Sequence, residues 1–216
     1  ERDFRLAVRM GEPRVALVES VRAPCRAEGR VDQPGSPPLA VRAQVRLEPS
    51  PNELPILELG EEAQALPAEI RRELLNPGTA RSWSGPHGHP LRHCRVVLES
   101  VAVTPSRPWA TSWLLGALQD GIGRAAEQQP ELLEPMVRVA VEVPEAFLAP
   151  ILGDLQQRHA TVLEVEAVGD QRRVLARAAL SRLMAYSTAV RSLSQGQAAF
   201  DVQPDGLAAA SSGPGA

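Results

Sequence analysis

The chain has 216 residues, of which 44% are hydrophobic, 23% charged and 3% aromatic, and its formal net charge is −3. No apolar run approaches the roughly 18 residues of a membrane span, so this composition excludes a helical membrane protein and a wholly disordered chain. The length allows one or two domains with cores of their own. Because the opening ERDFRL has no initiator Met and no apolar signal core, we expect a piece of a longer protein.

All 23 basic residues are arginine, and the chain contains no lysine. A phosphate-binding loop of the GxxxxGK type needs lysine, so this chain contains no such loop. The two cysteines, Cys25 and Cys94, are too few for a disulfide framework and suit a reducing compartment.

The N-terminal part of the sequence predicts short strands separated by proline and glycine. Residues 4–8 and 14–21 read as strands on either side of a Gly-Glu-Pro turn. Residues 23–38 are rich in proline and glycine and predict an irregular loop. Residues 39–47 alternate apolar and polar side chains, which is the pattern of a strand with one buried face.

The segment GPHGHPLRHC contains residue types that can hold a metal ion. Its candidate ligands for zinc are His87, His89, His93 and Cys94. Their spacing is not a standard zinc signature, and a loop that leads into a strand over residues 92–103 is the favoured interpretation. A metal-dependent enzyme built on these four residues stays open as an alternative.

A turn at residues 104–108 and a helix over residues 111–129 follow this strand. Apolar residues three or four apart form the buried stripe of the helix: Leu114, Leu118, Ile122 and Ala125. Gly116, Gly121 and Gly123 interrupt it, and each is expected to cost up to about 1 kcal/mol relative to alanine.

The stretch 132–200 predicts a complete small fold. Valines alternate from Val137 to Val143, and a helix with Phe147, Ile151 and Leu155 on one side comes next. Two short strands joined at Gly169 and a helix that ends near Gly196 follow, and a last strand runs from residue 198 to 202. The order βαββαβ is the ferredoxin-like arrangement.

Three motifs in this stretch resemble, in order and spacing, the last domain of the elongation factor G family of translational GTPases: LLEPM, GDLQQRH and AYSTAVRSLSQGQAAF. Within the family, AYSTAVRSLSQGQAAF and the upstream SVAVTPSRPWATS resemble the mitochondrial ribosome-releasing branch. The absence of a glycine-rich GRGQYGHV-type loop near residues 23–38 agrees with that branch.

The resemblance implies an α+β chain with a ribosomal-protein-S5-like α/β domain followed by the ferredoxin-like domain. Residues 1–12 would end a third domain, 13–131 would form a fourth, 132–202 a fifth, and 203–216 a disordered tail. The implied protein is a monomeric GTPase of the mitochondrial matrix that splits ribosomes together with ribosome recycling factor and makes no membrane contact. Its GTP and Mg²⁺ would bind outside this chain, which would hold no cofactor and perform no catalysis.

Other interpretations stay open beside this one. A fragment of a translocating elongation factor G would have the same fold. A factor that has lost ribosome binding would also explain Thr104, where family members commonly carry histidine at the tip of the fourth domain.

Charge and resemblance together suggest residues that contact ribosomal RNA. Residues 171–200 contain five arginines and no acidic residue, whereas residues 120–170 contain ten acidic residues and three arginines. A local arginine stripe on an acidic chain suits a phosphate backbone. The expected contacts are Thr104, Ser106, Arg107, Arg158, Arg172, Arg173, Arg182 and Arg191.

Two positions depart from glycines of the family pattern. Ala160 and Ala185 stand at turns where the pattern has glycine. We expect these turns to be strained, because alanine disfavours positive φ. Tyr186 lies in the apolar stripe of the last helix, so core packing is expected for it more than stacking on a base.

Overall fold

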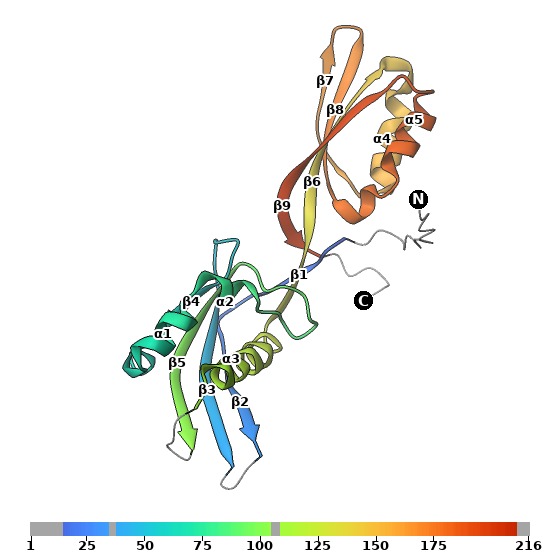
Figure 1. Cartoon of the computed structure of the whole chain (residues 1–216). Coiled ribbons are helices and arrows are strands. Elements are labelled where there is room, and N and C mark those ends of the chain that lie inside the picture. Colours follow the sequence, from blue (N-terminus) through green and yellow to red (C-terminus); the bar gives the residue numbers. More distant parts are fainter. Residues whose placement is uncertain (1–14, 35–37, 105–108, 211–216) are drawn as a thin grey trace, which may run out of the picture. The chain divides into compact units, whose positions relative to one another are not determined.

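The computed structural model describes residues 15–34, 38–104 and 109–210 (Figure 1). The predicted strand at residues 4–8 lies outside this range, as do the expected contacts Ser106 and Arg107. The described chain divides into two compact units, one over 17–133 with residues 209–210 and the other over 134–208 with residues 15–16. This division lies close to the predicted boundary at residue 132, and the chain passes from one unit to the next within a single strand, β6 (Pro130–Pro144).

The N-terminal unit contains a four-stranded sheet in the order β2-β3-β5-β4. Its β-strands are β1 (Val18–Val21), β2 (Cys25–Gln33), β3 (Leu39–Pro49), β4 (Ile56–Leu59) and β5 (Cys94–Thr104). Its helices are η1 (Ala63–Ala65), α1 (Ala68–Leu74), α2 (Pro77–Arg81) and α3 (Thr111–Ala126). The first three sheet strands are antiparallel, β4 joins β5 in parallel, and β1 pairs with the first residues of β6.

Alternating residues of β3 and β5 form the core of this unit against α3. The apolar positions of β3 are at most 3% exposed, and in β5 Cys94, Val96 and Leu98 are fully buried. The predicted stripe of α3 is also fully buried. This core was therefore predicted correctly, because the buried residues repeat every two positions in the strands and every three or four positions in α3.

The prediction of an irregular loop over residues 23–38 was wrong. Cys25–Gln33 is strand β2, which pairs along its whole length with Leu39–Leu47 of β3. Prolines flank this strand at residues 24, 34, 37 and 38 and do not interrupt it. A proline-rich composition hid the strand, whose hydrogen bonds come from β3 and not from local propensity.

Gly29 in β2 allows α3 to lie directly on the sheet. A Cβ at Gly29 would lie 1.9 Å from the carbonyl oxygen of Ala117 and 2.3 Å from the backbone nitrogen of Gly121. A Cβ at Gly121 would in turn lie 2.8 Å from Cγ2 of Val45. Gly121 is thus required by close packing, whereas a Cβ at Gly123 would meet nothing within 4 Å.

The C-terminal unit has the predicted βαββαβ order. Its elements are β6, η2 (Glu145–Phe147), α4 (Leu148–Gln157), β7 (Thr161–Val168), β8 (Gln171–Ala179), η3 (Leu180–Leu183), α5 (Tyr186–Leu193) and β9 (Ala199–Ala209). The strands lie in the order β9-β6-β8-β7, and both longer helices cover one face of the sheet (Figure 1). The ferredoxin-like prediction is confirmed.

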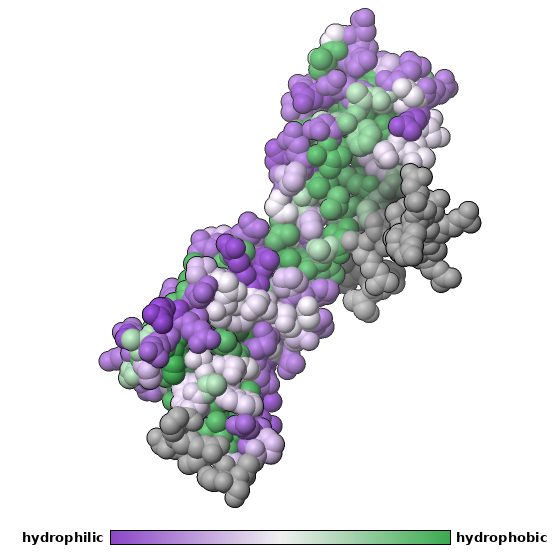
Figure 2. Space-filling view, viewed as in Figure 1, coloured by the Kyte–Doolittle hydropathy of each residue, from purple (hydrophilic) through white to green (hydrophobic). Residues whose placement is uncertain are grey.

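One face of this sheet packs on the helices and the other is open. Val139, Val141 and Val174 are fully buried, as are Ile151 and Leu155 of α4. Tyr186 is 2% exposed and belongs to the same core, as expected from its place in the apolar stripe. On the surface seen in Figure 2, hydrophobic residues gather in the middle of this unit between hydrophilic margins.

The two expected strained turns differ in their outcome. Ala185 has φ 57° and ψ 15°, the left-handed conformation that alanine disfavours, so that expectation is confirmed. At the end of α4 the left-handed residue is His159, with φ 57°, and not Ala160. The turn begins one residue earlier than predicted, because the Ala160 N–H bonds the carbonyl of Leu155 and needs His159 to reverse the chain.

The predicted tail at residues 203–216 is partly wrong. Strand β9 continues through these residues to Ala209. Gly206 has φ 76°, and the preceding Asp205 is held by Arg138 of β6 and by Arg177, which lies one strand further in the sheet. Long-range ion pairs stabilise a segment whose apolar content alone predicts no structure. Residues 211–216 lie outside the described part.

Candidate nucleic-acid interface

Most arginines of the basic stretch 171–200 have acidic partners from other elements. Arg172 pairs with Glu145, and Nε of Arg173 lies 3.7 Å from Oε1 of Glu142. Arg173 also lies 3.5 Å from Glu166. Both arginines were expected to contact RNA, and the structure places them in ion pairs on the exposed surface.

Arg158, directly after α4, binds the backbone segment that leads into α5. Its Nε donates to Oδ2 of Asp154 at 2.8 Å, and its Nη1 donates to the carbonyls of Arg182 at 2.9 Å and Met184 at 3.3 Å. The guanidinium also lies over the Tyr186 ring, 5.1 Å from its centroid. Because these contacts occupy the planar fork of Arg158, a phosphate contact would have to replace them.

Asp205 joins two strands of the open face, a role that was not predicted from the sequence. Its carboxylate accepts from Nη2 of Arg138 at 2.8 Å and from Nε of Arg177 at 2.6 Å. The hydrogen bond from Arg177, together with the charges of both arginines, holds the pKa of Asp205 below its ordinary value. The only available signal was an acidic residue in a segment that otherwise reads as a tail.

A surface on and around α5 keeps its arginines free of acidic partners. We call it the α5 surface, and its exposed side chains are Arg182, Ser187, Thr188, Arg191, Ser192 and Gln195. Among the described residues, Arg182 and Arg191 take part in no ion pair. Positive charge interspersed with uncharged hydrogen-bonding groups is the composition that suits a phosphate and sugar backbone.

Thr104 is the last residue of β5 and lies at one end of the N-terminal sheet. It is exposed and stands opposite Ala40 near the start of β3. The last residue of β2 lies at the same end, since Gln33 pairs with Leu39. Thr104 therefore belongs to an end of the sheet built by three strands, where a contacting tip can be presented.

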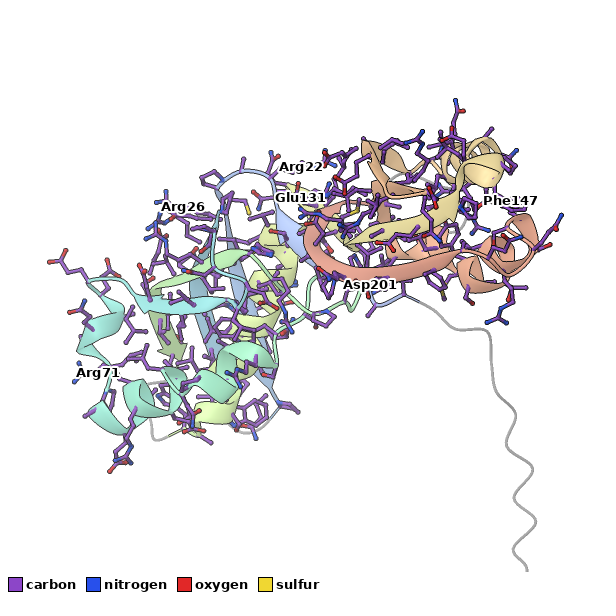
Figure 3. All side chains as sticks on the ribbon, turned by 90° about the horizontal axis from the view of Figure 1, so that it is seen from above. Arg22, Arg26, Arg71, Glu131, Phe147 and Asp201 are labelled. Carbon is purple, nitrogen blue, oxygen red and sulfur yellow. The ribbon has the colours of Figure 1, made fainter. Side chains whose placement is uncertain are left out.

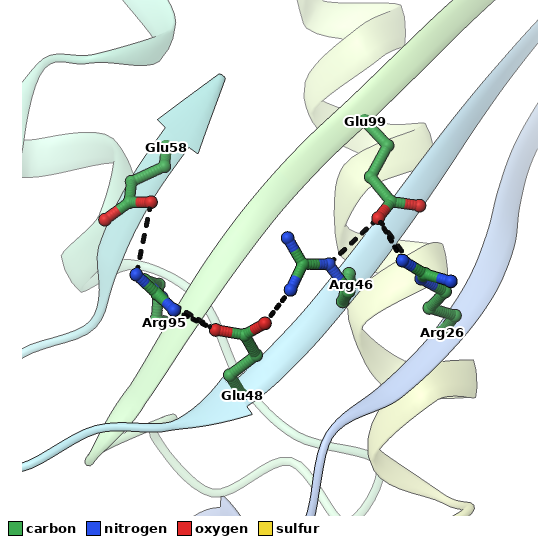
Figure 4. Close-up of polar contacts among 6 residues, drawn as sticks. All are labelled: Arg26, Arg46, Glu48, Glu58, Arg95 and Glu99. Carbon is green, nitrogen blue, oxygen red and sulfur yellow. Dashed lines mark hydrogen bonds and ion pairs between the residues drawn. The ribbon is translucent and has the colours of Figure 1, made fainter. Parts of the chain in front are cut away.

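The open face of the N-terminal sheet is covered by alternating charges (Figure 4). Arg26 and Arg46 share Oε1 of Glu99, at 3.0 and 2.9 Å. Glu48 bridges Arg46 and Arg95, and Nη1 of Arg95 lies 3.5 Å from Glu58. This ladder joins β2, β3, β5 and β4. Its arginines are neutralised, so the face is a poor candidate for phosphate contact.

Six arginines in the part of the N-terminal unit that the structure describes take part in no ion pair. They are Arg22, Arg30, Arg71, Arg72, Arg81 and Arg92, of which Arg22 and Arg71 are labelled in Figure 3. They come from several elements, including β1–β2, α1 and α2. Of these, Arg71 and Arg72 share α1 with the exposed acids Glu69 and Glu73.

Glu19 organises the histidine segment. Glu19 is 3% exposed, and its carboxylate accepts from the backbone N–H groups of His87 at 3.1 Å and His89 at 3.0 Å. Nδ1 of His87 lies 2.9 Å from Oε2 of the same carboxylate. This anchor was missed from the sequence, although an acidic residue within the buried run of β1 was a visible signal.

The two cysteines are buried and lack the features of reactive thiols. Burial raises the pKa of Cys25 to about 11, and the neighbouring Cys94 acts in the same direction. Burial also raises the pKa of Cys94, whose Sγ donates to the carbonyl of Arg92 at 3.1 Å. Within the described ranges, no group of three or more histidine, cysteine, aspartate or glutamate residues could hold a metal ion. The geometry thus disfavours the metal-enzyme alternative.

A shallow groove of about 410 Å³ lies on the open face of the C-terminal sheet. Arg138, Glu142, Arg173 and Leu175 line it together with residues of β9. The arginines already bind acidic partners, and the lining offers no cysteine, serine or histidine nucleophile. No helix in the described ranges is long and apolar enough to cross a membrane.

Comparison with known proteins identifies relatives. Residues 131–214 match the family described as the elongation factor G C-terminus. The chain is 31% identical over 204 residues to elongation factor G 2 of Desulfotalea psychrophila, covering 93% of this chain and 30% of the relative. It is 29% identical over 213 residues to elongation factor G of Thermotoga petrophila, covering 94% and 30%.

A solved structure shares the fold. A crystal structure of a protein from Thermus thermophilus aligns with a TM-score of 0.76 at 20% identity, over 93% of this chain and 30% of that one. The chain thus spans about 30% of the length of the relatives that it matches.

Proposed function

We propose, from the homology of this chain to elongation factor G and the C-terminal domain of that family in residues 131–214, that it is the ribosome-binding part of a translational GTPase. GTP and Mg²⁺ would be bound by a domain outside these residues, since the chain has no lysine for a phosphate-binding loop. The chain itself would act through contact and shape.

The observation that carries the proposal is the α5 surface within the homologous domain. It presents Arg182 and Arg191 with exposed serine, threonine and glutamine side chains and no acidic residue from 171 to 200. The other predicted contacts in this unit, Arg158, Arg172 and Arg173, are engaged by acidic residues. We therefore assign the main contact with ribosomal RNA to Arg182 and Arg191, and a secondary one to the sheet end at Thr104.

The finer role that we propose is ribosome recycling in the mitochondrial matrix, by a monomer working with ribosome recycling factor. Two features of the sequence support it: the segments AYSTAVRSLSQGQAAF and SVAVTPSRPWATS resemble the releasing branch, and a glycine-rich GRGQYGHV-type loop is absent near residues 23–38. Translocation by an elongation factor G is the second candidate, and the names of the bacterial relatives favour it.

A mechanical role suits the construction of the N-terminal unit. The ion-pair ladder spans all four strands of the sheet, and α3 lies on it with backbone contacts at Gly29. Both features resist bending, so force applied at the Thr104 end would be transmitted to the opposite end of the sheet. Such a unit would push on its partners during subunit separation.

Recycling and translocation are distinguished by two assays on the full-length protein. Purified protein is added with GTP and ribosome recycling factor to post-termination mitochondrial ribosomes, and subunit separation is followed by light scattering. The same preparation is tested for movement of a peptidyl-tRNA on programmed ribosomes. The proposal expects separation without translocation, and translocation without separation would contradict it.

A further inference from the structure

The outer edge of β7 is open to another strand. β7 pairs only with β8, and all eight of its residues are exposed. Within the part of the chain that the structure describes, no backbone bond joins β7 to anything outside its own sheet. An edge strand in this condition presents a row of free N–H and C=O groups.

The opposite edge of the same sheet is protected in a way that β7 is not. Strand β9 carries Pro204, which has no N–H to donate, and Gly206 at φ 76°, which bends the strand. β7 contains no proline, glycine, lysine or arginine. Its one irregularity is a register shift between Val162 and Glu164, which leaves residues 164–168 regular.

The two sides of β7 differ in chemistry. Val165 stands opposite the fully buried Val174 and so points to the helix-covered face, yet it is 43% exposed because it lies at the edge. Glu164 and Glu166 stand opposite Leu175 and Arg173 and point to the open face. Val162 is also exposed, at 39%, so the edge of the core itself reaches the surface here.

We propose that β7 is a docking edge for an extended segment of a partner protein that alternates apolar and basic side chains. Such a segment would add a strand to the sheet, with its apolar residues beside Val162 and Val165 and its basic residues beside Glu164 and Glu166. A second copy of this chain fits poorly, because two β7 strands would bring their glutamates together. Glu164 forms no ion pair with any described residue, so its charge is available, whereas Glu166 lies 3.5 Å from Arg173 and would exchange or share that partner.

Capped eight-residue peptides added to the isotopically labelled full chain test the proposal. One alternates valine and arginine, a second has the same composition in two blocks, and a third alternates valine and glutamate. The alternating valine–arginine peptide is expected to slow amide exchange at residues 164–168 and to bind at least about tenfold more tightly than the other two. Equal binding of the block peptide would mean attraction by charge alone and would overturn the proposal.

A second test reverses the charges of the two glutamates on β7. In Glu164→Arg/Glu166→Arg the preference should switch to the valine–glutamate peptide, while the matched Glu61→Arg/Glu62→Arg variant, changed on the other unit, should keep the original preference. Amide exchange of β8 reports whether each variant is folded. Absence of protection in β7 with any peptide, or the same switch in both variants, would overturn the assignment of the edge.

Discussion

Ala185 adopts a left-handed backbone conformation that alanine disfavours. Its φ of 57° precedes the first turn of α5, and a non-glycine residue in this region costs about 1 kcal/mol or more. We expect Ala185→Gly to raise the free energy of unfolding of the C-terminal unit by about 0.5–1 kcal/mol, measured by urea titration. Ala189→Gly, inside the same helix, should lower it by a similar amount. Destabilisation by both changes would contradict the strain at Ala185.

The glycines of β2 and α3 differ in what surrounds them. Gly29→Ala would place a methyl group 1.9 Å from the Ala117 carbonyl oxygen, so we expect a loss of about 3 kcal/mol or failure to fold. Gly123→Ala meets nothing within 4 Å and should stabilise α3 by up to about 1 kcal/mol. Thermal unfolding of the two variants beside the unchanged chain measures both effects, and similar midpoints would contradict the close packing.

Prediction of single residues from the sequence succeeded where their conformation depends on the neighbouring residues of the chain. Ala185 could be identified without coordinates because it stands where the resembled family pattern has glycine, and alanine disfavours the positive φ that a glycine in a turn can indicate. Ala160 could not be assigned in the same way, because the choice between His159 and Ala160 depends on which carbonyl of α4 accepts the next N–H. From the sequence, Gly121 was expected only to weaken its helix. Its role in close packing was not visible, because Gly29, against which it packs, is distant in sequence.

At the scale of elements, Asp205 should make the attachment of β9 dependent on pH. Its pKa is lowered in the folded chain, so its stabilising contribution is fully present above the ordinary aspartate value of about 3.9 and is lost as the pH falls through the lower folded value. Asp205→Asn should therefore remove part of the acid sensitivity below about pH 4 and lower stability at neutral pH.

Amide exchange of β9 and unfolding titrations between acid and neutral pH measure this effect. Asp201→Asn is the matched control, since Asp201 lies on the same strand and forms no ion pair with the described residues. The stability difference between the unchanged chain and Asp205→Asn should shrink in acid, and a difference that stays constant with pH would contradict the role of the carboxylate.

Elements were predicted well from sequence wherever a period ran without interruption. The strands of residues 39–47 and 137–143 and the apolar stripe of α3 carry their patterns within a single segment. β2 and the second half of β9 were missed because their partners, β3 and the arginines of β6 and β8, supply the stabilisation. Proline near β2 and low apolar content in β9 then pointed to loop and tail.

At the scale of the whole molecule, arginine counts alone overstated the nucleic-acid interface. Residues 171–200 contain no acidic residue, but Glu142, Glu145, Glu166 and Asp205 reach their arginines from other strands and turns. Such pairings depend on sheet order, which a list of charges does not contain. Of the five arginines in this stretch, only Arg182 and Arg191 form no ion pair with a residue that the structure describes.

Binding of the chain to purified ribosomes tests the central claim most directly. We expect Arg182→Glu/Arg191→Glu to weaken cosedimentation at least about tenfold and to reduce its salt dependence, because two phosphate contacts are lost. Arg72→Glu/Arg81→Glu makes the same charge change on α1 and α2 and should bind like the unchanged chain. Equal weakening by both pairs, or unchanged binding by the first, would contradict the assignment of the α5 surface to ribosomal RNA.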